Sequence, residues 1–346
     1  MKILAIVLAL AVSVLGVALF ARAVASIVGV IKLGGPTFGR TDHRADRWKH
    51  LLAETLGHTR MLQWNKIGIA HWFVFVAFGA LFFTLITAYG QLFNPRFRLP
   101  VIGQWVVYEW ASELIAWLGL LSIVFLMAIR FALRNSGRQS RFFGSRTWMA
   151  VYVELTILCI VICVLLIRAL EYQLLGTDTS RVHFPLTWFI FPAGISTGVL
   201  ETAILAVAAL KIIISMGWFV TIGLNTTMGV AWHRFTVWPN IWFKRESGGG
   251  PALGALQPIL VDGLPLDFAE IEDLDEDAAL GVGSVENFTW KGLLDFTSCT
   301  ECGRCQSQCP AWATDKPLSP KLLVMALRDH VDREKLAFEH GVDSHQ

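Results

Sequence analysis

The stretch WMAVYVELTILCIVICVLLIRALEY, residues 148–172, decides the fold class of this chain. It is apolar over a length that can cross a bilayer as a helix, for which about 20 residues are needed. Four more stretches of this kind lie near residues 3–33, 64–93, 109–133 and 199–233. The composition agrees, because 54% of the 346 residues are hydrophobic and only 16% are charged, which is low for a soluble domain. We therefore predict an all-α membrane protein whose residues 1–245 form a bundle of five transmembrane helices.

The distribution of basic residues between the loops predicts the topology. Residues 34–63, residues 134–147 and the segment after helix five are rich in Lys and Arg. The two remaining loops contain only Arg96, Arg98 and Arg181. By the positive-inside rule, the basic segments face the cytoplasm. We expect a multi-pass plasma-membrane protein with its N-terminus outside. It should contact lipid and not nucleic acid, because the sequence contains no nucleic-acid-binding motif.

Two segments outside the helices have a distinct character. The apolar stretch 184–192 is too short to span a bilayer, and we expect it to lie on the outer surface or to dip into it. Residues 246–287 begin with a Gly-rich run and contain no Lys or Arg, but they contain many acids between Asp262 and Asp277. This pattern predicts a flexible acidic linker, with a docking surface for a basic partner as the alternative.

Four cysteines close to the C-terminus form the most specific motif in the chain. Cys299, Cys302, Cys305 and Cys309, followed by Pro310, spell C-x₂-C-x₂-C-x₃-C-P. This is the ligand spacing of a bacterial-type [4Fe–4S] cluster, in which the fourth Cys ligates the other cluster of a two-cluster protein. We expect the first three cysteines to hold one cluster and the fourth to reach a second. The remainder, residues 288–346, is thus predicted to be an incomplete, ferredoxin-like α-helical segment in the cytoplasm.

A disulfide framework or a zinc site would fit these four cysteines less well. Disulfide frameworks suit small secreted domains. Zinc sites usually consist of two separated C-x-x-C pairs. The two remaining cysteines, Cys159 and Cys163, are four residues apart in an apolar helix, where packing is their expected role.

Two histidines are candidate ligands of a haem. His71 lies about two turns into the second predicted helix, and His233 lies at the cytoplasmic end of the fifth. Two neutral imidazoles on facing helices can occupy both axial positions of a b-type haem. The alternative is that each ring only hydrogen-bonds to its neighbours, as a polar group in a membrane must. His58 is a weaker candidate ligand, and we expect it to be a surface residue.

The segments around these histidines resemble a known cytochrome. Asn65-Lys-Ile-Gly-Ile-Ala-His71 and His233-Arg-Phe-Thr-Val-Trp-Pro239 resemble the segments that hold the cytoplasm-proximal haem in the cytochrome b subunit of respiratory nitrate reductase. That family binds two haems through two histidines on helix two and two on helix five. The other two ligands would fall near Leu81 and Ser215, neither of which can bind haem iron as His does. The resemblance thus implies one haem b, near the cytoplasmic face.

The cysteine segment resembles a second family. Residues 288–305 and 310–321 resemble bacterial membrane-bound iron–sulfur reductases related to heterodisulfide reductase, most of all the electron-transfer-flavoprotein dehydrogenases that feed menaquinone during fatty-acid β-oxidation. The resemblance implies reduced electron-transfer flavoprotein as donor and menaquinone as substrate. The family continues with a second four-cysteine motif and two CCG domains. Only 37 residues follow Cys309, so we expect a C-terminally truncated chain whose full-length form holds a second cluster.

Ionisable residues within the predicted helices are the remaining candidates, because charge in a membrane is costly and is retained for function or for an ion pair. Lys211 lies near mid-bilayer, with Glu113 and Glu201 as candidate partners. A quinone contact or proton route and a structural ion pair both remain open for it. Arg168 and Glu171, three residues apart, are expected to pair.

A second set of ionisable residues lies towards the cytoplasmic side. Glu154 near the inner end of helix four could deliver protons to a quinone. Three basic residues could neutralise haem propionates or simply follow the positive-inside rule: Arg60, Lys66 and Arg234.

Together these predictions describe a membrane electron-transfer oxidoreductase. Electrons from a cytoplasmic donor would pass through the [4Fe–4S] segment and haem b to menaquinone. One alternative is a heterodisulfide-reductase-like module that links quinone and thiol–disulfide chemistry. The other is a non-catalytic membrane anchor with a structural cluster.

Overall fold

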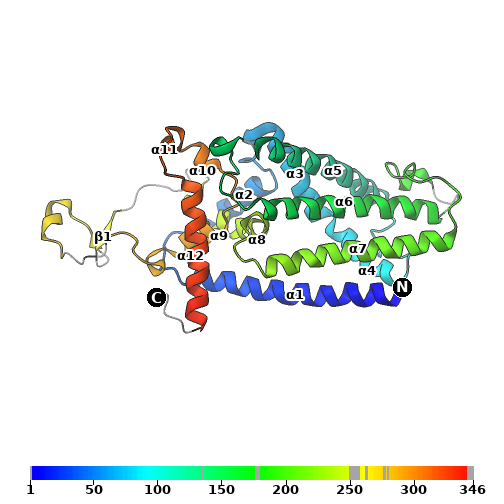
Figure 1. The fold of residues 1–346 in the computed structure, drawn as a ribbon, viewed down its shortest axis with the longest axis horizontal. Helices are drawn as coiled ribbons and strands as arrows, with labels where there is room; N and C mark the ends of the chain where they lie inside the picture. The colour runs from blue at the N-terminus through cyan, green and yellow to red at the C-terminus, as the bar shows by residue number, and fades with distance from the viewer. Residues whose placement is uncertain are drawn as a thin grey trace. The chain divides into compact units, whose positions relative to one another are not determined.

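The computed structural model of this chain describes residues 2–134, 136–175, 180–248, 258–261, 264–275, 278 and 280–340. Almost all of its regular structure is helical (Figure 1). The chain divides into two compact units. The first comprises Met1–Ala23 and Arg60–Asn225, and the second comprises Val24–Thr59 and Thr226–Gln346.

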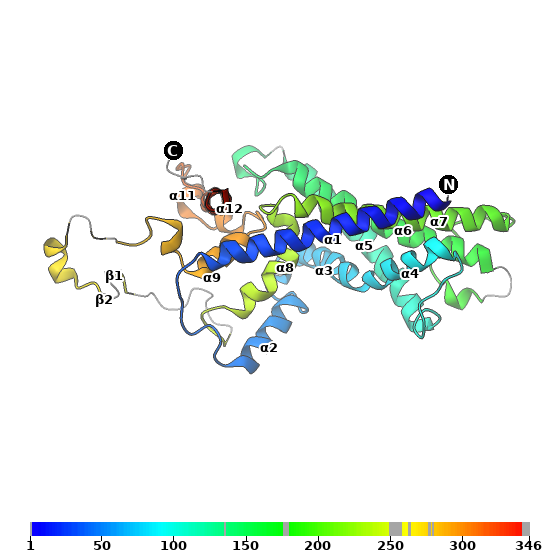
Figure 2. The ribbon, with the colours of Figure 1, turned by 90° about the horizontal axis from the view of Figure 1, so that it is seen from below.

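The first unit is a bundle of long apolar helices, of which α5, α6 and α7 run side by side (Figures 1 and 2). Its α-helices are the N-terminal part of α1 (Lys2–Lys32), α3 (Asn65–Ala80), α4 (Phe82–Phe93), α5 (Val106–Arg134), α6 (Thr147–Leu175) and α7 (Thr197–Gly223). Helix α6 packs against α5 and α7, α3 packs against α5, and α4 packs against α7. The 3₁₀ helices η1 (Leu62–Trp64), η2 (Gly137–Gln139) and η4 (Arg181–His183) lie in the connections.

Both the centre and the outer surface of this bundle are apolar. Small and branched side chains such as Ala88, Ala208 and Ile212 are fully buried in the centre. Large side chains such as Leu121, which is 64% exposed, cover the outside, as is expected where lipid is the solvent. Among the described residues, α1, α5, α6 and α7 are long and apolar enough to cross a membrane, and α3 with α4 would add a fifth span. By the length and composition of its helices, the chain agrees with the prediction of an all-α membrane protein.

The predicted helix over residues 64–93 is wrong in one respect, because it is broken at Leu81. Helices α3 and α4 meet there at an angle of 40°. The side chain of Thr84 donates a hydrogen bond to the carbonyl of Leu81 (2.5 Å), so a hydroxyl competes with the backbone at the break. The Thr84 hydroxyl also accepts a hydrogen bond from the ammonium of Lys211 (2.6 Å), which links the break to α7.

The predicted helix over residues 199–233 is wrong at its C-terminal end. Helix α7 stops at Gly223, and a separate helix, α8 (Gly229–Trp242), carries His233. The amide of Asn225 donates to the carbonyl of Thr221 (2.7 Å) and satisfies one of the last carbonyls of α7. The polar run of Asn225, Thr226 and Thr227 marks this end in the sequence, but it lies between apolar residues and was included in the predicted span.

The second unit contains the shorter helices and the cysteine motif. Its elements are the C-terminal part of α1, α2 (Arg44–Thr55), α8, β1 (Leu260–Val261), β2 (Leu264–Pro265), η5 (Phe268–Asp273), η6 (Val285–Asn287), α9 (Trp290–Thr297), α10 (Arg304–Ser307), α11 (Pro310–Ala313) and α12 (Pro320–His340). Helix α8 packs against α2 and α9, and α12 packs against α9 and α10 (Figure 2). Helices α9 and α12 flank the cysteine motif in the sequence.

A buried arginine fastens α2 to the end of α8. The side chain of Arg47 is only 1% exposed. It donates to the carbonyls of Trp242 (2.9 Å) and Lys244 (2.7 Å) and forms an ion pair with Asp42. The last carbonyls of α8 are thereby satisfied by a positive charge, which also complements the helix dipole.

The predicted acidic linker, residues 246–287, is only partly described. Residues 249–257, 262–263, 276–277 and 279 lie outside the described residues. The described parts include the two-residue antiparallel strands β1 and β2 and the 3₁₀ helix η5.

Candidate functional site

The four cysteines sit on a succession of tight turns between α9 and α11. Cys299 follows the C-terminal end of α9, and Cys309 is the N-cap of α11, with Pro310 at its first position. Between them, Glu301 (φ 59°) and Gly303 (φ 71°) both adopt the left-handed conformation, which glycine supplies without strain. This backbone reverses direction within a few residues, as a loop that wraps one cluster must.

The thiols share one neighbourhood around a buried cation. All four are free, with Cys302 and Cys305 exposed. Burial raises the pKa of the Cys299 and Cys305 thiols above the usual range. The ammonium of Lys321 is fully buried, and its pKa is lowered by burial, although Glu301 and then the thiols of Cys299, Cys302 and Cys305 act to raise it. Three predicted ligands of one cluster therefore lie close to the same charge.

The described residues contain no group of three or more His, Cys, Asp and Glu side chains arranged to hold a metal ion. The four thiols thus share a loop without forming a ligand shell. Their chemistry nevertheless fits an iron–sulfur cluster, because thiolates are its ligands and the set contains thiols only. Ligation would displace the thiol protons, so cluster binding is coupled to deprotonation.

The cysteine loop is tied to α12 by buried polar contacts. Arg328, 7% exposed, forms ion pairs with Glu301 (3.1 Å) and Asp329 (3.0 Å). The hydroxyl of Ser319 donates to the side-chain oxygen of Gln306 (2.9 Å) and accepts from the backbone of Leu322 at the start of α12 (3.3 Å). The second bond makes Ser319 the N-cap of α12.

Helix α8, which carries His233, packs directly onto the cysteine segment within the second unit. A Cβ atom on Gly229 would lie 1.9 Å from the carbonyl oxygen of Cys299, so only glycine permits this approach. The side chain of Asn240 donates to Asp295 on α9 (2.8 Å). One candidate haem ligand and the four cysteines therefore belong to one compact unit.

The ring of His233 has an orientation suited to metal binding. Its Nδ1 lies 3.2 Å from the carbonyl oxygen of Gly229, one turn earlier in α8. A carbonyl only accepts, so Nδ1 is the donor, and the ring is held in the tautomer that presents Nε2 as a metal ligand. His71 is half-buried in α3 of the first unit. The two histidines thus belong to different units, and the haem pair stays a prediction.

The other predicted cytoplasmic-side residues are dispersed along the chain. Arg60 and Lys66 belong to the first unit and Arg234 to the second, so their role as propionate contacts also stays a prediction. His58 is only 5% exposed, and its Nδ1 bonds the carbonyl of Thr55 (2.5 Å), so the expectation of a surface residue is wrong. Burial lowers the pKa of His58.

The two helix cysteines and Glu154 have ordinary surroundings. Cys163 is 3% exposed, as expected for a packing residue. Glu154 is also buried and forms an ion pair with Arg130 (2.7 Å). Its proton-delivery role stays a prediction.

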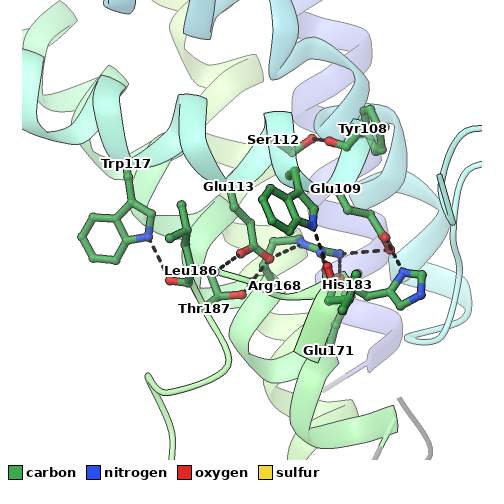
Figure 3. Close-up of polar contacts among 12 residues, drawn as sticks. Tyr108, Glu109, Ser112, Glu113, Trp117, Arg168, Glu171, His183, Leu186 and Thr187 are labelled. Atoms are coloured by element: carbon green, nitrogen blue, oxygen red, sulfur yellow. Dashed lines mark hydrogen bonds and ion pairs between the residues drawn. The ribbon is translucent and has the colours of Figure 1, made fainter. Parts of the chain in front are cut away.

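A buried ionic network in the first unit is the main feature that the sequence did not reveal. Arg168 on α6 forms ion pairs with Glu113 (3.0 Å), Glu171 (3.1 Å) and Glu109 (3.9 Å), as Figure 3 shows. The predicted pairing of Arg168 with Glu171 is confirmed. The glutamates of α5 are 55 and 59 positions away in sequence, so spacing could not predict them.

The candidate partners of Lys211 are wrong. Glu113 pairs with Arg168, and Glu201 pairs with Arg96 (3.3 Å). Lys211, 1% exposed, donates instead to Thr84. Among the described residues it forms no ion pair within 4 Å, so the hydroxyl of Thr84 is the polar group that its ammonium contacts.

The short apolar stretch 184–192 packs into the bundle. Phe184 and Thr187 are fully buried. The carboxylate of Glu113 accepts hydrogen bonds from the backbone of Leu186 (2.8 Å) and from the hydroxyl of Thr187 (2.8 Å), as Figure 3 shows. Irregular backbone is tolerated at such a position only when its polar groups are satisfied, and Glu113 satisfies them.

Known proteins match short segments of this chain. It is 44% identical over 63 residues to the EtfAB:quinone oxidoreductase of Syntrophomonas wolfei, which is 18% of this chain and 9% of that protein. It is 55% identical over 53 residues to a probable membrane-anchored ferredoxin of Chromohalobacter salexigens, 15% of this chain and 8% of the relative. It is 47% identical over 57 residues to the probable iron–sulfur-binding oxidoreductase FadF of Bacillus subtilis, which is 16% of this chain and 8% of that protein. All three relatives have names that denote an oxidoreductase or an iron–sulfur protein.

The matched segments span less than a tenth of each relative. No family model and no solved structure matches the chain. The apolar helices and the match to a membrane-anchored ferredoxin together support a membrane protein.

Proposed function

We propose that this chain relays electrons from a cytoplasmic donor, through an iron–sulfur segment and a haem, to menaquinone in the membrane. The observation that carries the proposal is the packing of Gly229, in the helix of His233, against the backbone of Cys299. This contact joins the proposed cluster site and one proposed haem ligand in a single compact unit. The membrane helices of residues 1–245 would provide the quinone with its lipid environment.

The residues have distinct roles in this proposal. Cys299, Cys302 and Cys305 would hold one [4Fe–4S] cluster, and Cys309 would reach a second one. His71 and His233 would be the axial ligands of one haem b. These cofactors supply one-electron chemistry, and the chain binds, orients and shields them.

The proposed donor is reduced electron-transfer flavoprotein, and the proposed acceptor is menaquinone. This choice is supported by the name of the Syntrophomonas wolfei relative, an EtfAB:quinone oxidoreductase, and by the resemblance of the cysteine segment. The proposed orientation places the cysteine segment in the cytoplasm, on the side of the basic loops.

Optical and magnetic spectra of the purified protein test the proposal. We expect a [4Fe–4S] signal in electron paramagnetic resonance and a b-type α-band in the reduced-minus-oxidised visible spectrum. His71→Ala and His233→Ala should each abolish the α-band, whereas His50→Ala on α2 is the control that should keep it. Absence of the band from the wild type would refute the haem, and its persistence in either variant would refute that ligand.

The donor and the acceptor need a separate experiment. Reduced electron-transfer flavoprotein is mixed with the full-length protein in liposomes that contain menaquinone, and oxidation of the flavin is followed. Electron transfer that requires both partners supports the assignment. Failure of the flavoprotein to reduce the haem would remove the fatty-acid-oxidation role, while the spectra would still report on the cofactors.

A further inference from the structure

A polar cavity lies among α4, α5, α6 and α7 of the first unit, and Lys211, for which a proton route was one open role, is part of its lining. Its lining is dominated by charged, amide and hydroxyl side chains, with few apolar ones: Thr84, Thr87, Gln91, Arg98, Leu99, Gly103, Tyr108, Glu109, Ser112, Val164, Ile167, Arg168, Glu171 and Lys211. Polar side chains within a membrane bundle are expensive and normally face a partner or a water-filled space. The cavity therefore requires an occupant.

Three polar atoms of the lining lack a hydrogen-bond partner among the described residues. They are Oε1 of Gln91, Oε1 of Glu109 and Nη2 of Arg98. Gln91 is fully buried and Glu109 is 1% exposed. Two of these atoms accept and one donates, and leaving a buried polar atom unsatisfied is costly. The occupant must therefore donate and accept hydrogen bonds at once.

The size of the cavity identifies the occupant as water. The centre of a water-sized sphere can reach about 40 Å³ of it. One water molecule needs about 10–15 Å³ by this measure, so the cavity holds about three. Water also satisfies donors and acceptors together, as the three orphaned atoms require. The few apolar side chains of the lining would not cover the ring system of a quinone.

The titratable groups at the cavity range in solvent exposure from the half-buried His183 to the buried Lys211. The side chain of His183 is 31% exposed, and its Nδ1 lies 2.5 Å from a carboxylate oxygen of Glu109 (Figure 3). Glu171, also in the lining, accepts from Gln91 (2.6 Å) and pairs with Arg168. Lys211, a third lining residue, donates to Thr84. Several groups that exchange protons thus line the same cavity.

We propose that this cavity is a hydrated proton-transfer site, in which water molecules held by Gln91, Glu109 and Arg98 connect His183 with Glu171 and Lys211. The charged or titratable groups that face the water are Arg98, Tyr108, Glu109, Arg168, Glu171 and Lys211. The loop asymmetry predicts that the His183 end faces outside. Reduction of one quinone consumes two electrons and two protons, and in this respect the inference rests on the proposed function.

Hydration is tested without any activity measurement. Hydroxyl radicals produced by X-rays in bound water label nearby side chains, and we expect labelling of Tyr108 and Ile167 in the purified wild-type protein. Gln91→Met removes one water-binding oxygen and should reduce this labelling, whereas the exposed Glu201→Gln should leave it unchanged. Absence of labelling at the cavity in the wild type would overturn the proposal.

Proton transfer is tested by infrared spectroscopy and by quinone reduction in liposomes. A carboxylate that passes a proton is protonated in transit, so a carboxyl band that shifts rapidly in D₂O should appear when the wild type is reduced, and Glu109→Gln should remove it. The same variant should slow menaquinone reduction about 10²-fold, as loss of a proton-transfer group does, with Glu201→Gln as control. A labelled cavity with an unchanged rate in Glu109→Gln would overturn the transfer role. Absence of quinone reduction in the wild type would instead refute the proposed function. In that case, slow exchange of the carboxyl proton in D₂O would overturn the proton-transfer site.

Discussion

Gly229 and Cys299 touch so closely that the first position of α8 admits no side chain. A Cβ atom on Gly229 would meet the Cys299 carbonyl oxygen at 1.9 Å and its carbon at 3.1 Å. Both neighbours are backbone atoms of the cysteine loop, which cannot rotate away as a flexible side chain could. The contact therefore couples the position of α8 to the position of the first proposed cluster ligand.

Gly229→Ala should destabilise the second unit and impair cluster assembly. Overpacking typically costs about 1–3 kcal/mol, and the upper end is expected because backbone must move. Iron content and thermal unfolding of the purified protein measure the two effects. Gly217→Ala on α7 is a matched control, because its Cβ would meet nothing within 4 Å and should cost nothing. Equal iron content in both variants would contradict the coupling.

The buried cation beside the cysteines should tune the proposed cluster. Lys321 is fully buried, and the thiols of Cys299, Cys302 and Cys305 act on its ammonium. A positive charge favours the reduced, more negative form of a cluster. Lys321→Met should therefore lower the reduction potential by about 60 mV, which corresponds to a tenfold change for one electron. A redox titration followed by electron paramagnetic resonance measures this shift.

Two variants control for folding in this experiment. Lys321→Arg keeps the charge and should leave the reduction potential of the cluster nearly the same as in the wild type. Lys316→Met removes a charge from an exposed position on the same segment and should have little effect. A potential that is the same in Lys321→Met and wild type would show that the ammonium does not act on the cluster.

Hydropathy and spacing predicted the long helices but not their ends. The apolar runs gave α1, α5 and α6 closely, because a membrane helix is defined by its length and composition. The breaks at Leu81 and after Gly223 were missed, since each depends on hydrogen bonds from Thr84 or Asn225 that hydropathy does not include. The sequence is apolar around Leu81, whereas the polar run of Asn225, Thr226 and Thr227 was a signal for the second break.

The site was predicted where its residues are close in sequence. Spacing alone identified the four-cysteine motif and the pairing of Arg168 with Glu171. The carboxylates of Glu109 and Glu113 come to Arg168 only through packing of α5 on α6, so no local pattern could reveal them. For the same reason, Lys211 was assigned to the wrong partners.

Arg168→Met should destabilise the first unit strongly. The guanidinium forms ion pairs with three buried carboxylates, and removal of one partner of a buried ion pair typically costs about 3–5 kcal/mol. Arg96→Met breaks an ion pair whose side chains are 50% and 40% exposed, so it should cost at most about 1 kcal/mol. Thermal unfolding in detergent compares the two variants. Similar midpoints would show that the network around Arg168 contributes little to stability.

His58 should make the stability of the second unit depend on pH. Burial lowers the pKa of His58 below its ordinary value of 6.5, and the hydrogen bond to Thr55 only partly opposes this. The folded protein therefore binds fewer protons at this site than the unfolded chain, so stability is present above pH 6.5 and is lost as the pH falls towards the lowered pKa. Thermal unfolding between about pH 7.5 and about pH 5.5 measures the loss.

His58→Asn should weaken this dependence, because Asn tolerates the positive φ of 49° and does not titrate. His43→Asn is the matched control, since His43 also has a positive φ (44°) but an exposed side chain. An unchanged pH dependence in His58→Asn would assign the effect to another group.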